Sequence, residues 1–146
     1  ATVAMTRGEV ASQNVVARLI PSLPRVDGVL TTGGGYGVAQ AFASAHKSIP
    51  IIHLGNYGSE MQWWWQQYKK SGYTTASAST NPGVSTAALW VAVDLLNGIK
   101  FPHDLQMQFL GVTQSELSSF KDLPFNAVAA VPYTNAWVLA HFPHTT

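Results

Sequence analysis

The glycine-rich segment Gly33-Gly-Gly-Tyr-Gly37 is the first place in this sequence where residue type and spacing suggest chemistry. It lies between the apolar run Val26 to Leu30 and a helical pattern, and in open α/β sheets such a turn exposes backbone amides to ligands. Phosphate is one ligand of such amides. However, the dinucleotide fingerprint needs a small residue where Val38 stands and an acidic residue about 20 positions later, and a phosphate loop needs Gly-Lys-Ser or Gly-Lys-Thr. The sequence therefore favours a turn whose bare backbone lets a ligand approach, with a purely structural turn as the second interpretation.

Other reactive residue types are present, but their spacing forms no catalytic or metal-binding pattern. The seven acidic residues include no local pair suited to acid–base work, although folding can bring distant carboxylates together. Pro143 lies between His141 and His144 and interrupts the helix that would align both histidines on a metal. Ser59 lacks the nucleophile-elbow sequence of a serine hydrolase. We therefore expect a binding protein rather than an enzyme, with no metal and no cofactor.

The composition limits the classes of protein to which the chain can belong. It has 146 residues, the length of one ordinary domain, with 47% hydrophobic residues, 10% charged residues and a formal net charge of +1. Such a weakly charged chain offers no electrostatic basis for binding nucleic acid. It has no cysteine, and no apolar run approaches the roughly 20 residues of a membrane span. Residues 1–9 lack a basic stretch followed by an apolar one, so we expect no signal peptide within the chain.

Apolar periodicity predicts alternating helices and strands. Thr6 and Glu9 have the spacing of a capping box, which starts a helix that Pro21 ends, and Asn81-Pro82 is expected to cap another helix. The predicted strands cover residues 26–30, 49–54, 74–79 and 105–112; the predicted helices cover residues 10–20, 36–45, 60–70, 84–96 and a short segment that starts at the capping box Thr113-Gln-Ser-Glu116, and the pattern is irregular from Lys121 onward. This order predicts a three-layer α/β/α fold with a mostly parallel sheet, in a single unit that spans residues 1–146.

The ends of three predicted strands provide the candidate ligand site. Parallel strands present their carboxyl ends at one edge of a sheet, so the loops that follow residues 30, 54 and 79 are expected to line one crevice. The candidate ligand-binding residues in these loops are Thr32, Gly33, Gly34, Asn56, Tyr57, Thr80 and Asn81.

Three consecutive tryptophans, Trp63, Trp64 and Trp65, fall within the predicted helix 60–70. Successive helical residues point about 100° apart, so the three rings cannot all face one core. We expect one or two of them to pack inside the protein and another to lie along its surface. The alternative is that one ring stacks on a sugar or covers an interface with another chain or lobe.

The order and spacing of several segments resemble the C-terminal half of the periplasmic sugar-binding proteins of ABC transporters, the ribose-binding-protein-like group of type I periplasmic binding proteins. The resemblance covers about residues 6 to 120, and the segments that carry it are Val26-Asp-Gly-Val-Leu30, Ile49-Pro-Ile-Ile-His-Leu-Gly55, Ser71-Gly-Tyr-Thr-Thr-Ala-Ser-Ala-Ser-Thr-Asn-Pro82 and Ala88-Leu-Trp-Val-Ala-Val-Asp-Leu-Leu-Asn-Gly98. It implies two α/β lobes that close around a sugar. Because members of the family are longer, it also implies that the chain is incomplete and lacks the first lobe.

The resemblance implies where ligand contacts should lie, and here the sequence departs from the family. The family's asparagine, aspartate and hinge-side glutamine fall on Gly33, Gly55 and Thr80, so each polar side chain is lost or shortened. The neighbouring residues expected to take over the ligand contacts are Thr32, Asn56, Tyr57 and Asn81.

The function implied by the resemblance is non-catalytic binding of a sugar or related solute for import. The implied partners are an ABC permease in the membrane and either the missing N-terminal lobe or another copy of this chain, and the implied location is the periplasm. Two alternatives remain open at this point. One is the ligand-sensing domain of a LacI-type transcriptional repressor, and the other is an α/β enzyme that binds a phosphorylated ligand at the glycine-rich turn.

Overall fold

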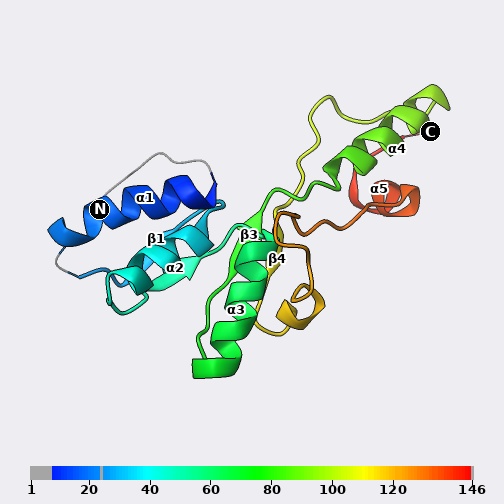
Figure 1. Ribbon diagram of the computed structural model, residues 1–146. Helices are drawn as coiled ribbons and strands as arrows, with labels where there is room; N and C mark the ends of the chain where they lie inside the picture. Colours follow the sequence, from blue (N-terminus) through cyan, green and yellow to red (C-terminus); the bar gives the residue numbers. More distant parts are fainter. Residues whose placement is uncertain (1–7, 24, 146) are drawn as a thin grey trace. The chain divides into compact units, whose positions relative to one another are not determined.

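The computed structural model describes residues 8–23 and 25–145, which form two compact units (Figure 1). The first unit comprises Ala1–Ser79 and Gly111–Ala129, and the second comprises Thr80–Leu110 and Ala130–Thr146. The chain therefore leaves the first unit after residue 79, returns to it at residue 111 and leaves it again after residue 129. Thr6, the first residue of the proposed capping box, lies outside the described residues.

The first unit contains the parallel strands that the sequence predicts. β1 (Gly28–Leu30) pairs with β2 (Ile51–His53), with Val29 opposite Ile52 and Leu30 opposite His53. A parallel bridge between Leu54 and Ser77 continues the ladder from β2 to β3 (Ser77–Ser79), and β3 neighbours β4 (Leu110–Val112). The predicted α/β class with a mostly parallel sheet is confirmed, whereas the described helices of this unit form one layer on β1 and β2, not the two layers of the predicted α/β/α arrangement.

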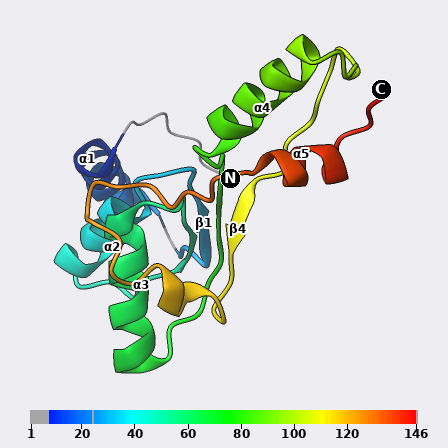
Figure 2. The same cartoon turned by 90° about the vertical axis from the view of Figure 1, so that its right-hand side faces the viewer.

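Three helices cover one face of these strands. They are α1 (Glu9–Leu19), which continues into the 3-10 turn η1 (Ile20–Ser22), α2 (Gly35–Ser44) and α3 (Gly58–Ser71). Figures 1 and 2 show α1 and α2 side by side. Val38, Ala41 and Phe42 recur at helical spacing on α2 and pack with Ile52 and Leu54 in one buried cluster. Burial of this apolar stripe against β2 holds the helices on the sheet.

The opposite face of β1 and β2 is exposed. Side chains alternate between the two faces of a strand, so Ile51 and Leu30 point away from the helix-covered face that holds Ile52. Ile51 is 63% exposed and Leu30 is 89% exposed, whereas Ile52 is fully buried. Within the described residues, cover by helices is therefore confined to the face of β1 and β2 that holds Ile52.

The three tryptophans of α3 divide as their helical spacing requires. Trp64 is fully buried and its indole Nε1 donates to Gln114 at 3.1 Å. Trp63 is almost fully buried and packs edge-on against Tyr73. Trp65 is partly exposed and lies under the Lys69 ammonium, 4.9 Å from the ring centroid. The prediction that one or two rings pack inside the protein and another lies along its surface is confirmed, with two rings inside.

The second unit consists of α4 (Val84–Leu96), α5 (Asn135–His141) and extended chain. Figures 1 and 2 show α4 and α5 together, and their contact buries Ala87, Val138 and Phe142. The Asn135 amide donates to the Asp94 carboxylate at 3.0 Å and also joins the two helices. Much of α4 remains apolar and exposed, including Leu89 at 61% and Leu96 at 89%.

Most predicted elements are present, with shifted ends. Helix 84–96 has the predicted bounds, whereas the predicted strand 105–112 is ordered as a strand only at Leu110–Val112. Its earlier residues Leu105 and Met107 instead pack against the core of the second unit. The 3-10 turn η2 (Leu117–Ser119) follows the predicted capping box, in which the Glu116 carboxylate accepts from the Thr113 amide. The apolar periodicity did not predict α5, because this short helix lies in a proline-interrupted region and has few turns over which a period can show.

Two isoleucines that are adjacent on β2 test the difference between its faces. Ile52→Ala is expected to lower the free energy of unfolding by about 2–4 kcal/mol, because it leaves a cavity in the core. Ile51→Ala is the matched control and is expected to change it by about 0.5 kcal/mol or less, since the side chain is mostly in water. Urea denaturation monitored by tryptophan fluorescence measures both. An equal loss for both variants would show that the exposed face is covered in solution.

Candidate ligand site

The loops that follow β1 and β2 meet at the carboxyl ends of these strands, where the sequence places the candidate site. A β-carbon on Gly55 would lie 2.6 Å from Gly33 Cα, so the two backbones touch and leave no room for a side chain at position 55. The glycine-rich turn also uses the left-handed region, since Gly34 has a φ of 91° and precedes the first residue of α2. Thr32, Gly33, Gly34, Asn56 and Tyr57 are thereby brought together in the first unit.

The buried carboxylate of Glu60 joins these two loops. Its Oε1 accepts from the Gly35 amide at 2.7 Å, and its Oε2 accepts from the amides of Gly55 at 2.8 Å and Tyr57 at 3.0 Å. The side chain of Glu60 is fully buried. Burial raises the pKa of Glu60 and outweighs the opposing effect of the three amide donors, and the nearby charge of Glu9 raises it further.

A second carboxylate, that of Glu9, bonds to the first turns of α2 and α3. It accepts from the Gly37 amide at 2.6 Å and from the Ser59 hydroxyl at 2.6 Å. Together with Glu60, it occupies two amides at the start of α2, which a bound phosphate would need. The two negative charges would also repel a phosphate. The geometry therefore argues against the phosphate-binding alternative.

The Asn56 side chain is buried at this site and bonds within the protein. The residue adopts a left-handed backbone with a φ of 69°, its side chain is fully buried, and the Ser77 hydroxyl donates to its Oδ1. The backbone amide of Asn56 donates to the same hydroxyl at 3.0 Å, and its backbone carbonyl accepts from the Ala129 amide at 2.9 Å. The Asn56 side chain therefore joins β2 to β3 inside the unit.

Tyr57 and Thr32 are the candidate side chains of the first unit that face solvent. Tyr57 is 38% exposed, and its ring lies against the glycine-rich turn, because a β-carbon on Gly33 would be 2.6 Å from Tyr57 Cε2. Thr32 is exposed in the loop that follows β1. The accessible part of this cluster thus consists of an aromatic ring, a hydroxyl and bare backbone, and it carries no charged side chain.

The two remaining candidates, Thr80 and Asn81, belong to the second unit. Asn81 is almost fully buried and closes a turn, with its Oδ1 accepting from the amides of Gly83 at 2.9 Å and Val131 at 3.0 Å. The predicted cap is therefore displaced: the Asn81 side chain bonds to Gly83, and the helix begins at Val84 rather than at Pro82. Thr80 is exposed.

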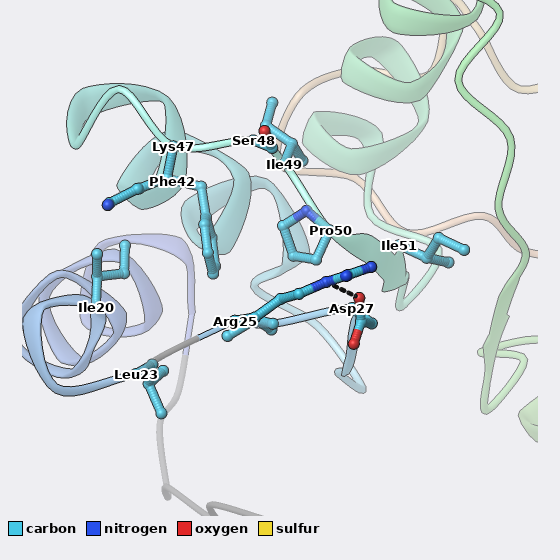
Figure 3. Close-up of a pocket in the computed structure, with 11 residues that line it drawn as sticks. Ile20, Leu23, Arg25, Asp27, Phe42, Lys47, Ser48, Ile49, Pro50 and Ile51 are labelled. Atoms are coloured by element: carbon cyan, nitrogen blue, oxygen red, sulfur yellow. Dashed lines mark hydrogen bonds and ion pairs between the residues drawn. The ribbon is translucent and has the colours of Figure 1, made fainter.

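A hollow of about 520 Å³ lies elsewhere, at the amino ends of β1 and β2 (Figure 3). Phe42 and Ile20 form part of its apolar wall, and the ion pair between Arg25 Nε and Asp27 Oδ1, 2.7 Å apart, lies at its exposed side. Ligands of open α/β sheets bind at the carboxyl ends of the strands, so this hollow lies at the wrong end for the candidate site.

The histidines that could bind a metal lie against aromatic rings. Within the described ranges there is no group of three or more acidic or histidine side chains arranged to hold a metal ion. His141 stacks on Trp137 with ring centroids 4.1 Å apart, and the His144 ring lies 6.0 Å from that of Phe101. No helix in the described part of the chain has the length and apolar character needed to cross a membrane.

Sequence reasoning missed the three side chains that organise the site, Glu9, Glu60 and Ser77. A signal was available for Glu60, because the third position of a helix favours a glutamate that accepts from the amide preceding the helix, as Glu60 does from Tyr57. Glu9 and Ser77 carried no local signal, since their partners lie 28 and 21 residues away in the sequence.

Comparison with solved structures identifies the class to which this fold corresponds. The crystal structure of an ABC transporter solute binding protein from Thermobispora bispora DSM 43833 matches 90% of this chain with a TM-score of 0.78 and 30% sequence identity. A crystal structure from Mycobacterium smegmatis matches 78% of the chain with a TM-score of 0.59 and 16% identity, which shows the fold alone. No family model and no curated protein matches the chain.

These matches extend over only part of each solved protein. The chain spans 41% of the Thermobispora protein and 39% of the Mycobacterium protein. Its α/β fold is that of a part of a solute-binding protein, as the sequence predicted. The comparison supports the general class of ABC transporter solute-binding proteins.

The close approach of the two loops is testable by substitution. Gly55→Ala is expected to lower the free energy of unfolding by about 1–3 kcal/mol, because the added methyl group must separate Gly55 from the backbone of Thr32 and Gly33. Gly111→Ala is the control, since the nearest atom to its added methyl group would be the Ser77 carbonyl oxygen at 3.9 Å. Thermal and urea unfolding measure both variants. A harmless Gly55→Ala would contradict the contact between the loops.

The raised pKa of Glu60 predicts a specific pH dependence of stability. Because its pKa is raised on folding, the Glu60 carboxyl keeps its proton to a higher pH in the folded chain than in the unfolded chain. The free energy of unfolding therefore falls as pH rises from the ordinary glutamate pKa, about 4.3, through the raised pKa of the folded state. Glu60→Gln has no titratable group at this position and is expected to abolish this fall in the free energy of unfolding. Urea denaturation at a series of pH values measures it.

Glu116 provides a control of opposite sign. The hydroxyl and amide of Thr113 both donate to its exposed carboxylate and lower its pKa. Its contribution to stability is therefore lost as pH falls. Glu116→Gln is expected to abolish the matching increase in the free energy of unfolding as pH rises. Identical pH profiles for the native chain and Glu60→Gln would refute the assignment for Glu60.

Proposed function

We propose that this chain binds an uncharged polyhydroxylated solute, a sugar or a related compound, for import by an ABC transporter, and that it catalyses no reaction. The structural match to an ABC transporter solute binding protein over 90% of the chain is the observation that carries the proposal. The site chemistry adds the solute class. Its accessible groups are uncharged, and the nearby carboxylates of Glu9 and Glu60 are engaged by backbone amides and a serine hydroxyl.

The proposed contacts combine one aromatic face with hydrogen bonds. The Tyr57 ring provides an apolar surface for the face of a sugar, while Thr32 and the backbone of Gly33 and Gly34 provide polar groups for its hydroxyls. Asn56 in the first unit, and Thr80 and Asn81 in the second, each remain candidates through their positions after strands. In this proposal Asn56 and Asn81 shape the loops that carry the ligand contacts, because both side chains are buried and bonded within the protein.

The role of the larger protein is also part of the proposal. The chain corresponds to the C-terminal part of a two-lobed binding protein and works with a first lobe, or with another copy of itself, to enclose the solute. The loaded protein then docks on a membrane permease from the periplasmic side. The exposed apolar residues Leu30 and Ile51 support association with another protein surface, since clustered exposed apolar residues mark such surfaces.

Titration with sugars followed by NMR of backbone amides tests the proposal on the chain itself. D-Ribose, D-xylose and D-glucose are the probes, and AMP is the probe for phosphate binding. The expected result is a saturable shift at the amides of Thr32, Gly33, Gly34 and Tyr57 with at least one sugar. Absence of any saturable shift with the sugars would reject sugar as the solute, and a shift at Gly35 and Gly37 with AMP would favour the phosphate alternative.

Two tyrosines with equal exposure provide a matched pair of variants. Tyr57 and Tyr68 are both 38% exposed, but Tyr68 lies in the last turns of α3 and outside the candidate site. Tyr57→Ala is expected to weaken sugar affinity roughly 3- to 10-fold through loss of the stacked ring, whereas Tyr68→Ala should leave it unchanged. The same amide titration measures both. Equal effects of the two substitutions would contradict the placement of the site.

A further inference from the structure

We propose that Glu60 is a positioning residue for the ligand site: its carboxylate holds the loop of Thr32 to Gly34 and the loop of Asn56 and Tyr57 in one arrangement. This inference rests on the proposed function, because it concerns the geometry of the same site. Glu60 itself does not face the solute, since it is fully buried beneath both loops.

The Glu60 carboxylate bonds to the residue that ends the first loop and begins α2, and to the second loop. One oxygen binds the amide of Gly35 and the other binds the amides of Gly55 and Tyr57. Among the described residues, no ion pair includes Glu60. A buried carboxylate is costly unless hydrogen bonds compensate for its lost hydration. Any movement that separates either loop from Glu60 therefore leaves a charge without compensation.

The location of Glu60 strengthens these bonds. It lies in the first turn of α3, and its Oε1 also reaches the first residue of α2, so the positive ends of two helix dipoles meet at one carboxylate. Gly35 permits the approach, because a β-carbon there would lie 2.8 Å from Glu60 Oε1 and 2.6 Å from Leu54 Cδ2. The glycine at position 35 is thus matched to the carboxylate at position 60.

Glu9 fixes the same turn from the other side. Its carboxylate bonds to Gly37 on α2 and to Ser59, the residue before Glu60. The first turn of α3 is consequently joined to α2 directly through Glu60 and indirectly through Ser59. This restraint is needed because Gly33 and Gly34, with φ values of 142° and 91°, give the turn between β1 and α2 little stiffness of its own.

Glu60→Gln tests the inference with little change of shape. The side-chain amide group replaces an accepting oxygen with a donor, which opposes a backbone amide instead of binding it. The expected result is a roughly 10-fold or larger loss of hydrogen-exchange protection at Gly35, Gly55 and Tyr57, with a smaller change at Ile52 in the core. Glu116→Gln, the same substitution at an exposed carboxylate, should change none of these amides. Unchanged protection in Glu60→Gln, or an equal loss at Ile52, would overturn the inference.

A measurement on the unaltered chain covers the case in which Glu60→Gln fails to fold. Amide protons that bind one carboxylate shift when it is protonated, so the amide resonances of Gly35, Gly55 and Tyr57 should share one transition in a pH titration. Independent or absent transitions at these three amides would also overturn the inference.

Sugar titration separates this inference from the proposed function. With whichever of D-ribose, D-xylose and D-glucose binds the unaltered chain, Glu60→Gln is expected to weaken affinity about 10-fold and Glu60→Asp to weaken it less, because aspartate retains the charge. Unchanged affinity in a folded Glu60→Gln variant would overturn the positioning role. If no sugar binds the unaltered chain while the three amides still respond as expected, the solute proposal fails and the restraint of the loops by Glu60 stands.

Discussion

The buried carboxylate of Glu60 is the interaction on which the geometry of the candidate site depends. Parallel strands place two loops at one edge of the sheet, but this alone does not fix their distance or orientation. Three backbone amides from the two loops converge on the two oxygens of one side chain. The high cost of leaving this charge unbonded makes the arrangement specific, because few other positions of the loops satisfy both oxygens.

The glycines of the first unit are the steric counterpart of this electrostatic restraint. A methyl group at position 55 would strike the first loop, and one at position 35 would strike the carboxylate and the core. The amides of Gly35 and Gly37, which a phosphate would need, bind carboxylates of the protein itself. The accessible side chains of the proposed site, Thr32 and Tyr57, carry no charge, which is consistent with the proposed neutral solute.

The uneven cover of the apolar faces relates the fold to the larger proteins that it resembles. α1, α2 and α3 bury one face of β1 and β2, while Leu30 and Ile51 on the other face remain in water. In the second unit, α4 likewise leaves Leu89 and Leu96 exposed. The chain matches about two fifths of each solved structure, so the proposed two-lobed protein accounts for apolar surface that this chain does not bury by itself.

The sequence by itself determined the α/β class, the parallel order of β1 and β2, the helix Val84–Leu96 and the division of the three tryptophans, because these follow from local periodicity. It also indicated the loops where a ligand site should lie. Only the tertiary structure decided what each residue does there: Asn56 and Asn81 turn inward to bond within the protein, and Glu9 and Glu60 join distant loops. The physical reason is that these roles depend on partners up to 50 residues away, as for Asn81 and Val131, and no local pattern records such a distance.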